Sequence, residues 1–177
     1  MLKGKKVILR PQRRSDIKLY LKWFNDLEVM KNLTLYLPMT EASEEKYLDD
    51  TMKSQAPIFV IEAILASGRR KPIGNCGFHK IEEKDKVALF GIAIGEKQLW
   101  GNGYGTEATK LVVDYGFKFL NLNKIEAEVL VSNKRSIEMH KNLGFIDEGC
   151  RRQKKYIEGK YEDCLMFGLL KSEWFKK

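Results

Sequence analysis

The stretch Gln98-Leu99-Trp100-Gly101-Asn102-Gly103-Tyr104-Gly105-Thr106 places three glycines at alternate positions, after an apolar run at 87–94 and before an amphipathic segment. Glycine adopts positive φ without a Cβ clash and lets a ligand come close to the backbone. Successive N–H groups can then converge on one anion, and a following helix adds the positive end of its dipole. The stretch therefore predicts a pyrophosphate-binding loop at the start of a helix.

The residue order within this loop argues against two common nucleotide-binding loops. A Walker loop ends in Gly-Lys-Ser/Thr, whereas this loop continues as Gly103-Tyr104-Gly105-Thr106. A dinucleotide-binding loop needs its third glycine at the position of Thr106. A plain strand-to-helix turn is the remaining alternative to a phosphate site.

Composition favours one domain over residues 1–177, because 177 residues with 44% hydrophobic content suffice for one sizeable core. Cys76, Cys150 and Cys164 are odd in number and widely spaced, which indicates neither a disulfide framework nor a metal site. No apolar run approaches the roughly 18 residues that span a bilayer, and residues 1–6 lack the apolar core of a signal peptide. We therefore expect a cytoplasmic protein that is not in a membrane.

The net charge of +8 raises a second class of function, a non-catalytic basic module that binds nucleic acid. Basic residues are scattered, apart from one cluster at Arg151, Arg152, Lys154 and Lys155. No aromatic-rich strand typical of an RNA-binding sheet accompanies this cluster. A solvated basic hairpin explains it equally well, so nucleic-acid binding is the alternative function rather than the first.

Hydrophobic periodicity predicts strands that alternate with helices. The expected strands are 7–11, 58–65, 73–81, 87–94, 125–131, 149–157 and 161–170. Helices are expected after the cap Ser15-Asp16, over 41–52, from the glycine loop to about residue 121, and over 136–143, where Gly144 ends the helix. The order of these elements predicts an α+β fold.

The pattern Gln/Arg-x-x-Gly-x-Gly/Ala, carried by Gln98, Gly101 and Gly103, resembles the acetyl-coenzyme A (acetyl-CoA) loop of the GNAT N-acetyltransferases. Further matches, in the same order as in that family, are Gly91-Ile92-Ala93-Ile94-Gly95, the run 100–108, Asn133 with Ser136, Leu143-Gly144-Phe145 and Ser172-Glu173-Trp174. They are similar to the branch that acetylates ribosomal-protein N-termini or polyamines. The resemblance covers nearly the whole chain. It implies a mixed, mostly antiparallel sheet of six to seven strands with about four helices.

This resemblance implies that the chain moves an acetyl group from acetyl-CoA to a primary amine by direct attack in a ternary complex. The acceptor would be a protein N-terminus, a polyamine or another small amine. No metal is implied, and relatives in this branch often form homodimers. Holding both reactants together turns a bimolecular encounter into an internal step.

The resemblance also assigns residues to the acyl carrier. Backbone groups of Ile92 and Ile94 would bind the pantetheine arm, with an N–H near Ile94 polarising the acetyl carbonyl. The pyrophosphate would lie against the loop residues Trp100, Gly101, Asn102, Gly103, Tyr104, Gly105 and Thr106. Many relatives carry Lys or Arg where this chain has Asn102. Asn133, with Ser136, would contact the pantetheine, although capping the next helix is an equal alternative for Asn133.

Proton transfer has three candidate residues. The family usually offers a Tyr as the acid for the departing thiolate, and His140 occupies that position here. Glu62, within an apolar strand, and His79, near the turn at 82–85, are candidate bases for the incoming ammonium. Each of the three has a purely structural alternative.

Acidic residues gather on the segment expected to line the acceptor side in relatives, namely Glu41, Glu44, Glu45, Asp49 and Asp50. Such acidity suits a polyamine or a basic peptide. A solvated helix face is the competing interpretation, since charged residues commonly occupy the exposed side of an amphipathic helix.

Overall fold

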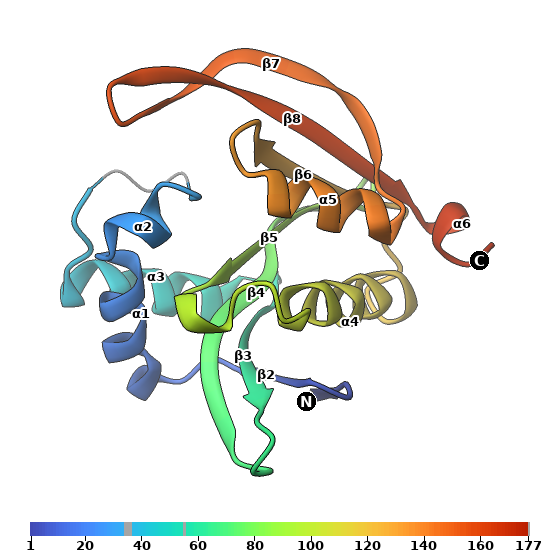
Figure 1. Ribbon diagram of the computed structural model, residues 1–177. Helices are drawn as coiled ribbons and strands as arrows, with labels where there is room; N and C mark the ends of the chain where they lie inside the picture. Colours follow the sequence, from blue (N-terminus) through green and yellow to red (C-terminus); the bar gives the residue numbers. More distant parts are fainter. Residues whose placement is uncertain (34–36, 55, 177) are drawn as a thin grey trace.

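The computed structural model describes residues 1–33, 37–54 and 56–176, and their strands form one eight-stranded sheet (Figure 1). The strands are β1 Leu2–Lys3, β2 Val7–Pro11, β3 Ile58–Ile64, β4 Arg70–Glu82, β5 Val87–Ile94, β6 Lys124–Leu130, β7 Ile146–Ile157 and β8 Lys160–Leu170. Their order in the sheet is β1-β2-β3-β4-β5-β6-β8-β7. Neighbours are antiparallel except β5 and β6, which are parallel. The predicted mixed, mostly antiparallel sheet is confirmed.

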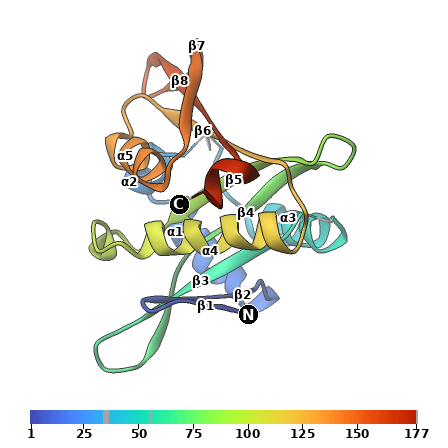
Figure 2. The same cartoon turned by 90° about the vertical axis from the view of Figure 1, so that its right-hand side faces the viewer.

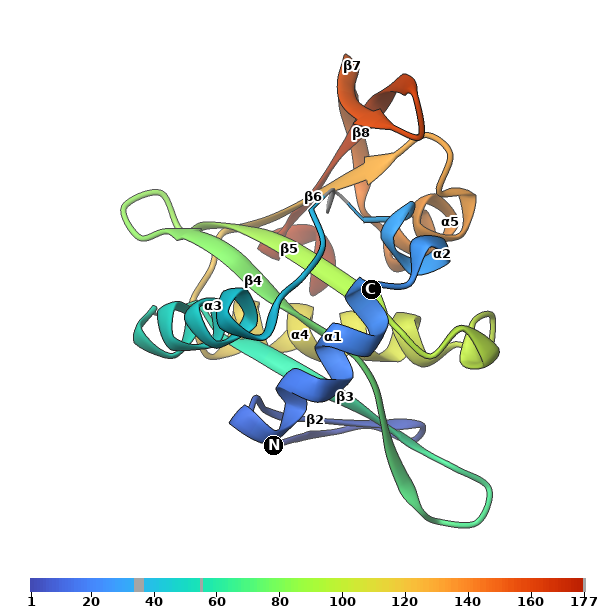
Figure 3. The same ribbon diagram turned by 90° about the vertical axis from the view of Figure 1, so that its left-hand side faces the viewer.

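Helices cover both faces of this sheet. They are α1 Ile17–Phe24, α2 Leu27–Met30, α3 Glu41–Lys53, α4 Tyr104–Lys118, α5 Lys134–Leu143 and α6 Lys171–Trp174, with 3-10 turns at Arg14–Asp16 and Lys97–Leu99. Helices α1 and α3 lie on one face, and α4 lies on the other (Figures 2 and 3). Trp23 of α1 packs with Val60 and Ala93, whereas Val112 and Phe117 of α4 belong to the larger core on the opposite face.

Strands β5 and β6 part from one another halfway along their length. They pair from Val87 with Lys124 to Phe90 with Ala127, and no further. Beyond that point β5 remains paired with β4, while β6 remains paired with β8. The separation leaves the last residues of β5 facing a gap between the two halves of the sheet. Ile92 and Ile94, which the resemblance assigns to the pantetheine arm, lie on the part of β5 that does not pair with β6, beside this gap.

The structure has more elements than the six to seven strands and about four helices expected from the sequence. The additional strand is β1, and the additional helices include α2 and α6. Each spans two to four residues, which is too short to show a periodic pattern. Strand β7 also begins at Ile146 rather than 149. Every residue of 146–154 is exposed, so no alternation marks its start.

Glu107 joins the N-terminal strands to the first turn of α4. Its Oε1 accepts a hydrogen bond from the Lys5 backbone N–H at 2.9 Å. Its Oε2 accepts from the N–H groups of Lys6 at 2.6 Å and Val7 at 2.9 Å. Hydrogen bonds to a charged acceptor are the stronger ones. Glu107 therefore links the start of α4, directly after the glycine loop, to the beginning of β2.

We expect Glu107→Ala to lower the free energy of unfolding by about 2 kcal/mol, because three backbone donors lose a charged acceptor. The measurement is chemical denaturation followed by circular dichroism. Glu45→Ala, which removes an exposed carboxylate on α3, is the matched control and should change stability by less than about 0.5 kcal/mol. Equal effects in the two variants would contradict the role of Glu107.

No helix within 1–33, 37–54 and 56–176 is both long enough and apolar enough to cross a membrane.

Candidate active site

The glycine loop folds as the anion-binding turn that its sequence predicts. Gly101 and Gly103 have φ of 78° and 81°, which is the left-handed region that favours glycine. Gly103 is the N-cap of α4, and its carbonyl accepts the first helical hydrogen bond, from the Glu107 N–H. The N–H groups of 104–106 precede that bond and have no acceptor within the helix. They are therefore available to an anion.

A cavity of about 390 Å³ lies over these N–H groups. Its lining includes the loop residues Trp100, Gly101, Gly103, Tyr104, Gly105 and Thr106, and it also includes Ile92, Ile94, Asn133 and Ser136. The predicted carrier residues are thus brought to one cavity, except Asn102, which is exposed beside it. The Asn102 carbonyl accepts a hydrogen bond from Lys6 Nζ at 3.0 Å. Lys6, directly before β2, therefore places a cation beside Asn102, where the resemblance would favour a basic residue. The sequence did not indicate this contact.

The side chain of Trp100 has a role beyond the predicted backbone cradle. Its indole Nε1–H donates a hydrogen bond to the Ile94 carbonyl at 2.7 Å. The guanidinium of Arg135 lies over the indole ring, 5.5 Å from its centroid, within the range of a cation–π contact. Trp100 therefore ties the loop to the end of β5 and places a cation on the wall of the carrier cavity.

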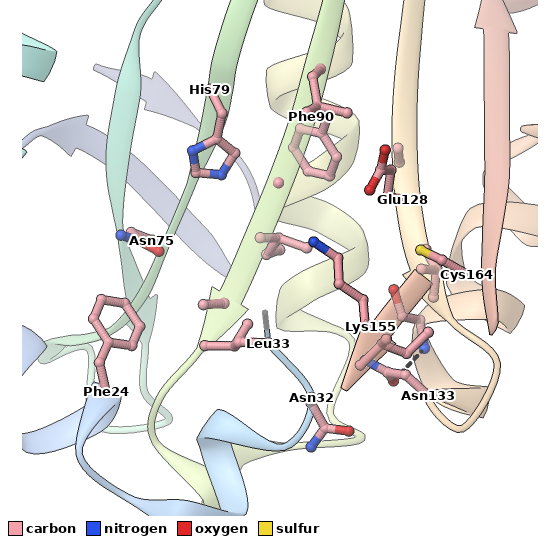
Figure 4. A pocket seen from close by; sticks show the side chains of 18 of the residues that line it. Phe24, Asn32, Leu33, Asn75, His79, Phe90, Glu128, Asn133, Lys155 and Cys164 are labelled. Atoms are coloured by element: carbon pink, nitrogen blue, oxygen red, sulfur yellow. Dashed lines mark hydrogen bonds between the residues drawn. The ribbon is translucent and has the colours of Figure 1, made fainter. Parts of the chain in front are cut away.

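A second cavity, of about 470 Å³, is lined by residues of β4, β5 and β6, among others (Figure 4). Residues that line both cavities are Asn32, Leu33, Ile92, Ala93, Asn133 and Ser136. The wall is mainly apolar, and its ionisable side chains are Glu44, Tyr47, His79, Glu128, His140, Lys155 and Cys164. Two adjacent cavities with shared lining residues can hold a carrier and an acceptor at the same time.

His140 lies on the wall of this second cavity and is only 2% exposed. Its Nδ1 is 2.8 Å from the Ser136 carbonyl oxygen. Because a carbonyl can only accept, Nδ1 carries the proton, and Nε2 is left with a lone pair. Nε2 is buried and has no hydrogen-bond partner among the described residues. The ring stacks on Phe167 and meets Phe145 edge-on, with centroids 5.6 Å and 4.9 Å away.

Burial lowers the pKa of the His140 imidazole below its ordinary value, and the Ser136 contact opposes this shift more weakly. The ring is therefore neutral at neutral pH, and its buried Nε2 is unprotonated. The resemblance predicts a proton donor at this position, whereas the tautomer inferred from the Ser136 contact makes Nε2 a proton acceptor in the resting protein.

Asn133 and Ser136 have local roles at the start of α5. The Asn133 Oδ1 accepts a hydrogen bond from the Ser136 N–H at 3.2 Å, which is the N-cap contact that its alternative interpretation expected. Asn133 still lines both cavities, and its Nδ2 has no hydrogen bond in the part of the chain that the structure describes. Capping therefore leaves a donor available for pantetheine.

The two candidate bases lie in different places. His79 lies over Gly91, where a Cβ would come within 2.2 Å of its Nε2, and it lines the second cavity. Desolvation lowers the pKa of His79, but its side chain is exposed at the cavity rim, so water limits that shift. Glu62 lies outside both cavities. Its Oε1 accepts a hydrogen bond from Arg10 Nε at 2.7 Å, and Arg10 also pairs with Asp16.

Sequence reasoning treated Glu44 only as one acid among several on its helix. In the structure Glu44 is 2% exposed and lines the second cavity, and its Oε2 has no hydrogen-bond partner among residues 1–33, 37–54 and 56–176. Glu41, Glu45 and Asp50 are exposed, and Asp49 pairs with Arg14. The available signal was spacing, because Glu44 lies one turn before the buried Leu48.

Comparisons with known proteins agree with this geometry. A Bacillus licheniformis protein named "Uncharacterized N-acetyltransferase p20" is 33% identical over 174 residues, or 96% of this chain and 95% of that protein. The Escherichia coli (strain K12) spermidine N(1)-acetyltransferase is 28% identical over 172 residues, or 95% of this chain and 88% of that protein. A crystal structure of the Vibrio cholerae spermidine N-acetyltransferase with CoA and spermine superposes with a TM-score of 0.88 at 24% identity, covering 97% of this chain and 99% of that one.

The family described as "Acetyltransferase (GNAT) domain" matches residues 6–146. That range contains the glycine loop, the parted strands and the His140 helix. The predicted GNAT fold is thereby confirmed, whereas the nucleic-acid-binding alternative receives no support from these relatives. This chain belongs to the GNAT family, and it is an N-acetyltransferase that uses acetyl-CoA.

Proposed function

We propose that the chain, as a single catalytic domain over 1–177, acetylates a primary amine that enters the second cavity while acetyl-CoA occupies the first. The observation that carries this proposal is the shared wall of the two cavities, which includes Ile92, Asn133 and Ser136. A thioester whose diphosphate lies on the 104–106 N–H groups would extend along the gap beside β5. Its acetyl carbon would then reach the acceptor side of that wall.

We further propose that His140 moves the proton. The amine nitrogen forms a bond to the acetyl carbon and becomes more acidic, and Nε2 of His140 accepts its proton. The C–S bond then breaks, and the imidazolium returns the same proton to the sulfur. Its Nδ1–H remains on the Ser136 carbonyl throughout, so one nitrogen serves as base and then as acid. His79 is the remaining candidate base, because it lines the same cavity.

Relatives name two acceptor types. Spermidine N(1)-acetyltransferases match over 95% or more of this chain, and a Bacillus subtilis relative carries the name of a ribosomal N-acetyltransferase. A panel assay that detects free thiol separates these possibilities, using spermidine, aminoglycosides, amino sugars and short peptides as acceptors. We expect thiol release that depends on the amine. Release no faster than the hydrolysis of acetyl-CoA alone, with every amine, would contradict the proposal.

Three other predictions from the sequence stay proposals. They are a cytoplasmic location, catalysis without a metal ion, and a homodimer. Activity after exhaustive chelation tests the second of these, and sedimentation velocity tests the third.

A further inference from the structure

Two buried side-chain polar atoms lack a hydrogen-bond partner within residues 1–33, 37–54 and 56–176. They are Nε2 of His140 and Oε2 of Glu44, and both residues line the acceptor cavity. Buried polar atoms in native proteins are nearly always paired, with protein or with a bound molecule. In the proposed reaction, the reacting amine would supply a hydrogen-bond partner for Nε2 of His140. A second N–H group on the same amine substrate would supply a hydrogen-bond donor for Glu44.

The position of Glu44 is set by its helix. Helix α3 begins after the N-cap Thr40, whose side chain accepts a hydrogen bond from the Ser43 N–H. Glu44 and Leu48 are its fully buried residues, so the face that carries them points inward. Among the carboxylates of α3, Glu44 alone lines the cavity. A helix of thirteen residues holds this carboxylate on rigid backbone rather than on a loop.

The surroundings of Glu44 favour a cation as its partner. None of the ion pairs among the described residues includes Glu44, so no salt bridge within that part of the chain compensates its charge. The same wall contributes the aromatic rings of Phe24 and Tyr47, whose faces attract cations. Lys155 enters the cavity from the opposite side to Phe24 and Asn75 (Figure 4). A cationic acceptor group would therefore be drawn away from Lys155 and toward Glu44.

We propose that Glu44 binds a second, non-reacting ammonium of the acceptor, so that the preferred acceptors are small aliphatic diamines or polyamines. This inference rests on the proposed function and narrows its acceptor class. A monoamine, or a peptide N-terminus with a neutral side chain, would leave the Glu44 oxygen unpaired. Leaving a buried charged group unpaired is costly, and this cost provides the discrimination.

The charge state of Glu44 gives the inference a pH dependence. Burial raises the pKa of Glu44, and burial together with the Glu44 charge raises the pKa of Tyr47 to about 12. Other ionisable groups that face this region are Tyr20 of α1 and the cavity residues His79, Glu128 and Lys155. Only the ionised carboxylate binds an ammonium strongly. The KM for a diamine should therefore rise as the pH falls through the raised pKa of Glu44.

The test compares 1,4-diaminobutane with n-butylamine, which has the same carbon chain and one ammonium fewer. For the wild type we expect a much higher kcat/KM for the diamine. Glu44→Gln should lower that preference about tenfold or more, chiefly through KM, with little change for butylamine. Glu45→Gln, at the exposed neighbouring position, is the matched control and should retain the preference. Acetyl-CoA affinity, measured by calorimetry, should be equal in all three proteins.

The outcomes separate the two proposals. Absence of amine-dependent thiol release in the wild type contradicts acetyl transfer itself. Release that is equal for the two amines, or an unchanged preference in Glu44→Gln, overturns the second-ammonium subsite and leaves acetyl transfer standing. A wild type that prefers acceptors bearing a carboxylate would assign recognition to Lys155 instead and would also overturn it. If Glu44→Gln does not fold, the wild-type preference measured against pH decides, because it must decline as Glu44 becomes protonated.

Discussion

Gly103→Val is expected to abolish the binding of acetyl-CoA while the rest of the fold survives. Gly103 has φ of 81°, where a β-branched residue costs about 1–3 kcal/mol. A side chain there would also crowd Lys6, whose Nζ would lie 3.2 Å from the new Cβ. The flexible Lys6 side chain can move aside, but the loop can relieve the backbone strain only by changing φ at Gly103, and this change turns the N–H groups of 104–106 away from their common focus.

The measurement for Gly103→Val is the melting temperature with and without acetyl-CoA. At about one hundred times Kd, a ligand stabilises the folded state by about 2.7 kcal/mol. For a chain of this size, that corresponds to a rise of roughly 5–11 °C in the wild type. We expect the rise to disappear in Gly103→Val.

Gly68→Val provides a matched control for backbone strain. Gly68 lies in the turn between β3 and β4 with φ of 77°, and nothing lies within 4 Å of its would-be Cβ. Its replacement should destabilise the protein by a similar amount but retain the rise with acetyl-CoA. A normal rise in Gly103→Val would show that the loop does not hold the diphosphate, and the assignment of the carrier cavity would fail.

His140→Phe is expected to reduce kcat by about 10²- to 10⁴-fold, the usual contribution of general acid–base catalysis. Phenylalanine retains a flat ring among Phe90, Phe145 and Phe167, so folding should be preserved. What disappears is the Nε2 lone pair. The dissociation constant for acetyl-CoA should stay within about twofold, since His140 lines only the acceptor cavity.

The pH profile distinguishes a proton acceptor from a proton donor at His140. Burial lowers the pKa of His140 below its ordinary value of 6.5, so the neutral, proton-accepting form is present at neutral pH. This form is lost as the pH falls through the lowered pKa. The ratio of wild-type to His140→Phe turnover should therefore decline toward acid pH. The titration of the amine substrate affects the turnover of both proteins equally, so it cancels in the ratio. A ratio that instead declines toward alkaline pH would indicate a donor.

His79→Phe is the comparison variant for this experiment. His79 lines the acceptor cavity, but it is exposed at the rim above Gly91. We expect a smaller loss of kcat than in His140→Phe. A larger loss in the His79 variant would transfer the proton-accepting role to His79.

An element could be predicted wherever its hydrophobic pattern extended over many consecutive residues. Strand β5 reads as one apolar run, and α4 shows helical spacing over fifteen residues. The elements that the sequence missed are brief ones, such as β1 and α2, whose formation depends on neighbours rather than on periodicity. The sequence predicts strand β7 over 149–157 but not its start at Ile146, because the first residues are held by pairing with β8 and show no alternation of their own.

The candidate site was predictable in its carrier half and only partly in its acceptor half. Positive φ at Gly101 and Gly103 is a local requirement that only glycine meets easily, so the loop could be recognised from its residues. Glu62 and Glu44 are both carboxylates on elements with buried faces, but the structure gives them different surroundings. Arg10, 52 residues away in the sequence, neutralises Glu62. Glu44 lines a cavity instead, and it forms no ion pair among the residues that the structure describes.

The sequence by itself determined the α+β order of elements, the glycine turn at the start of α4 and the placement of His140 on a short helix. These features depend on φ preferences and on spacing within a few residues. Tertiary structure alone decided that β5 and β6 part, that two cavities share a wall, and which nitrogen of His140 carries its proton. The partners of a buried charge or ring come from distant segments, so their identity exists only once the chain has folded.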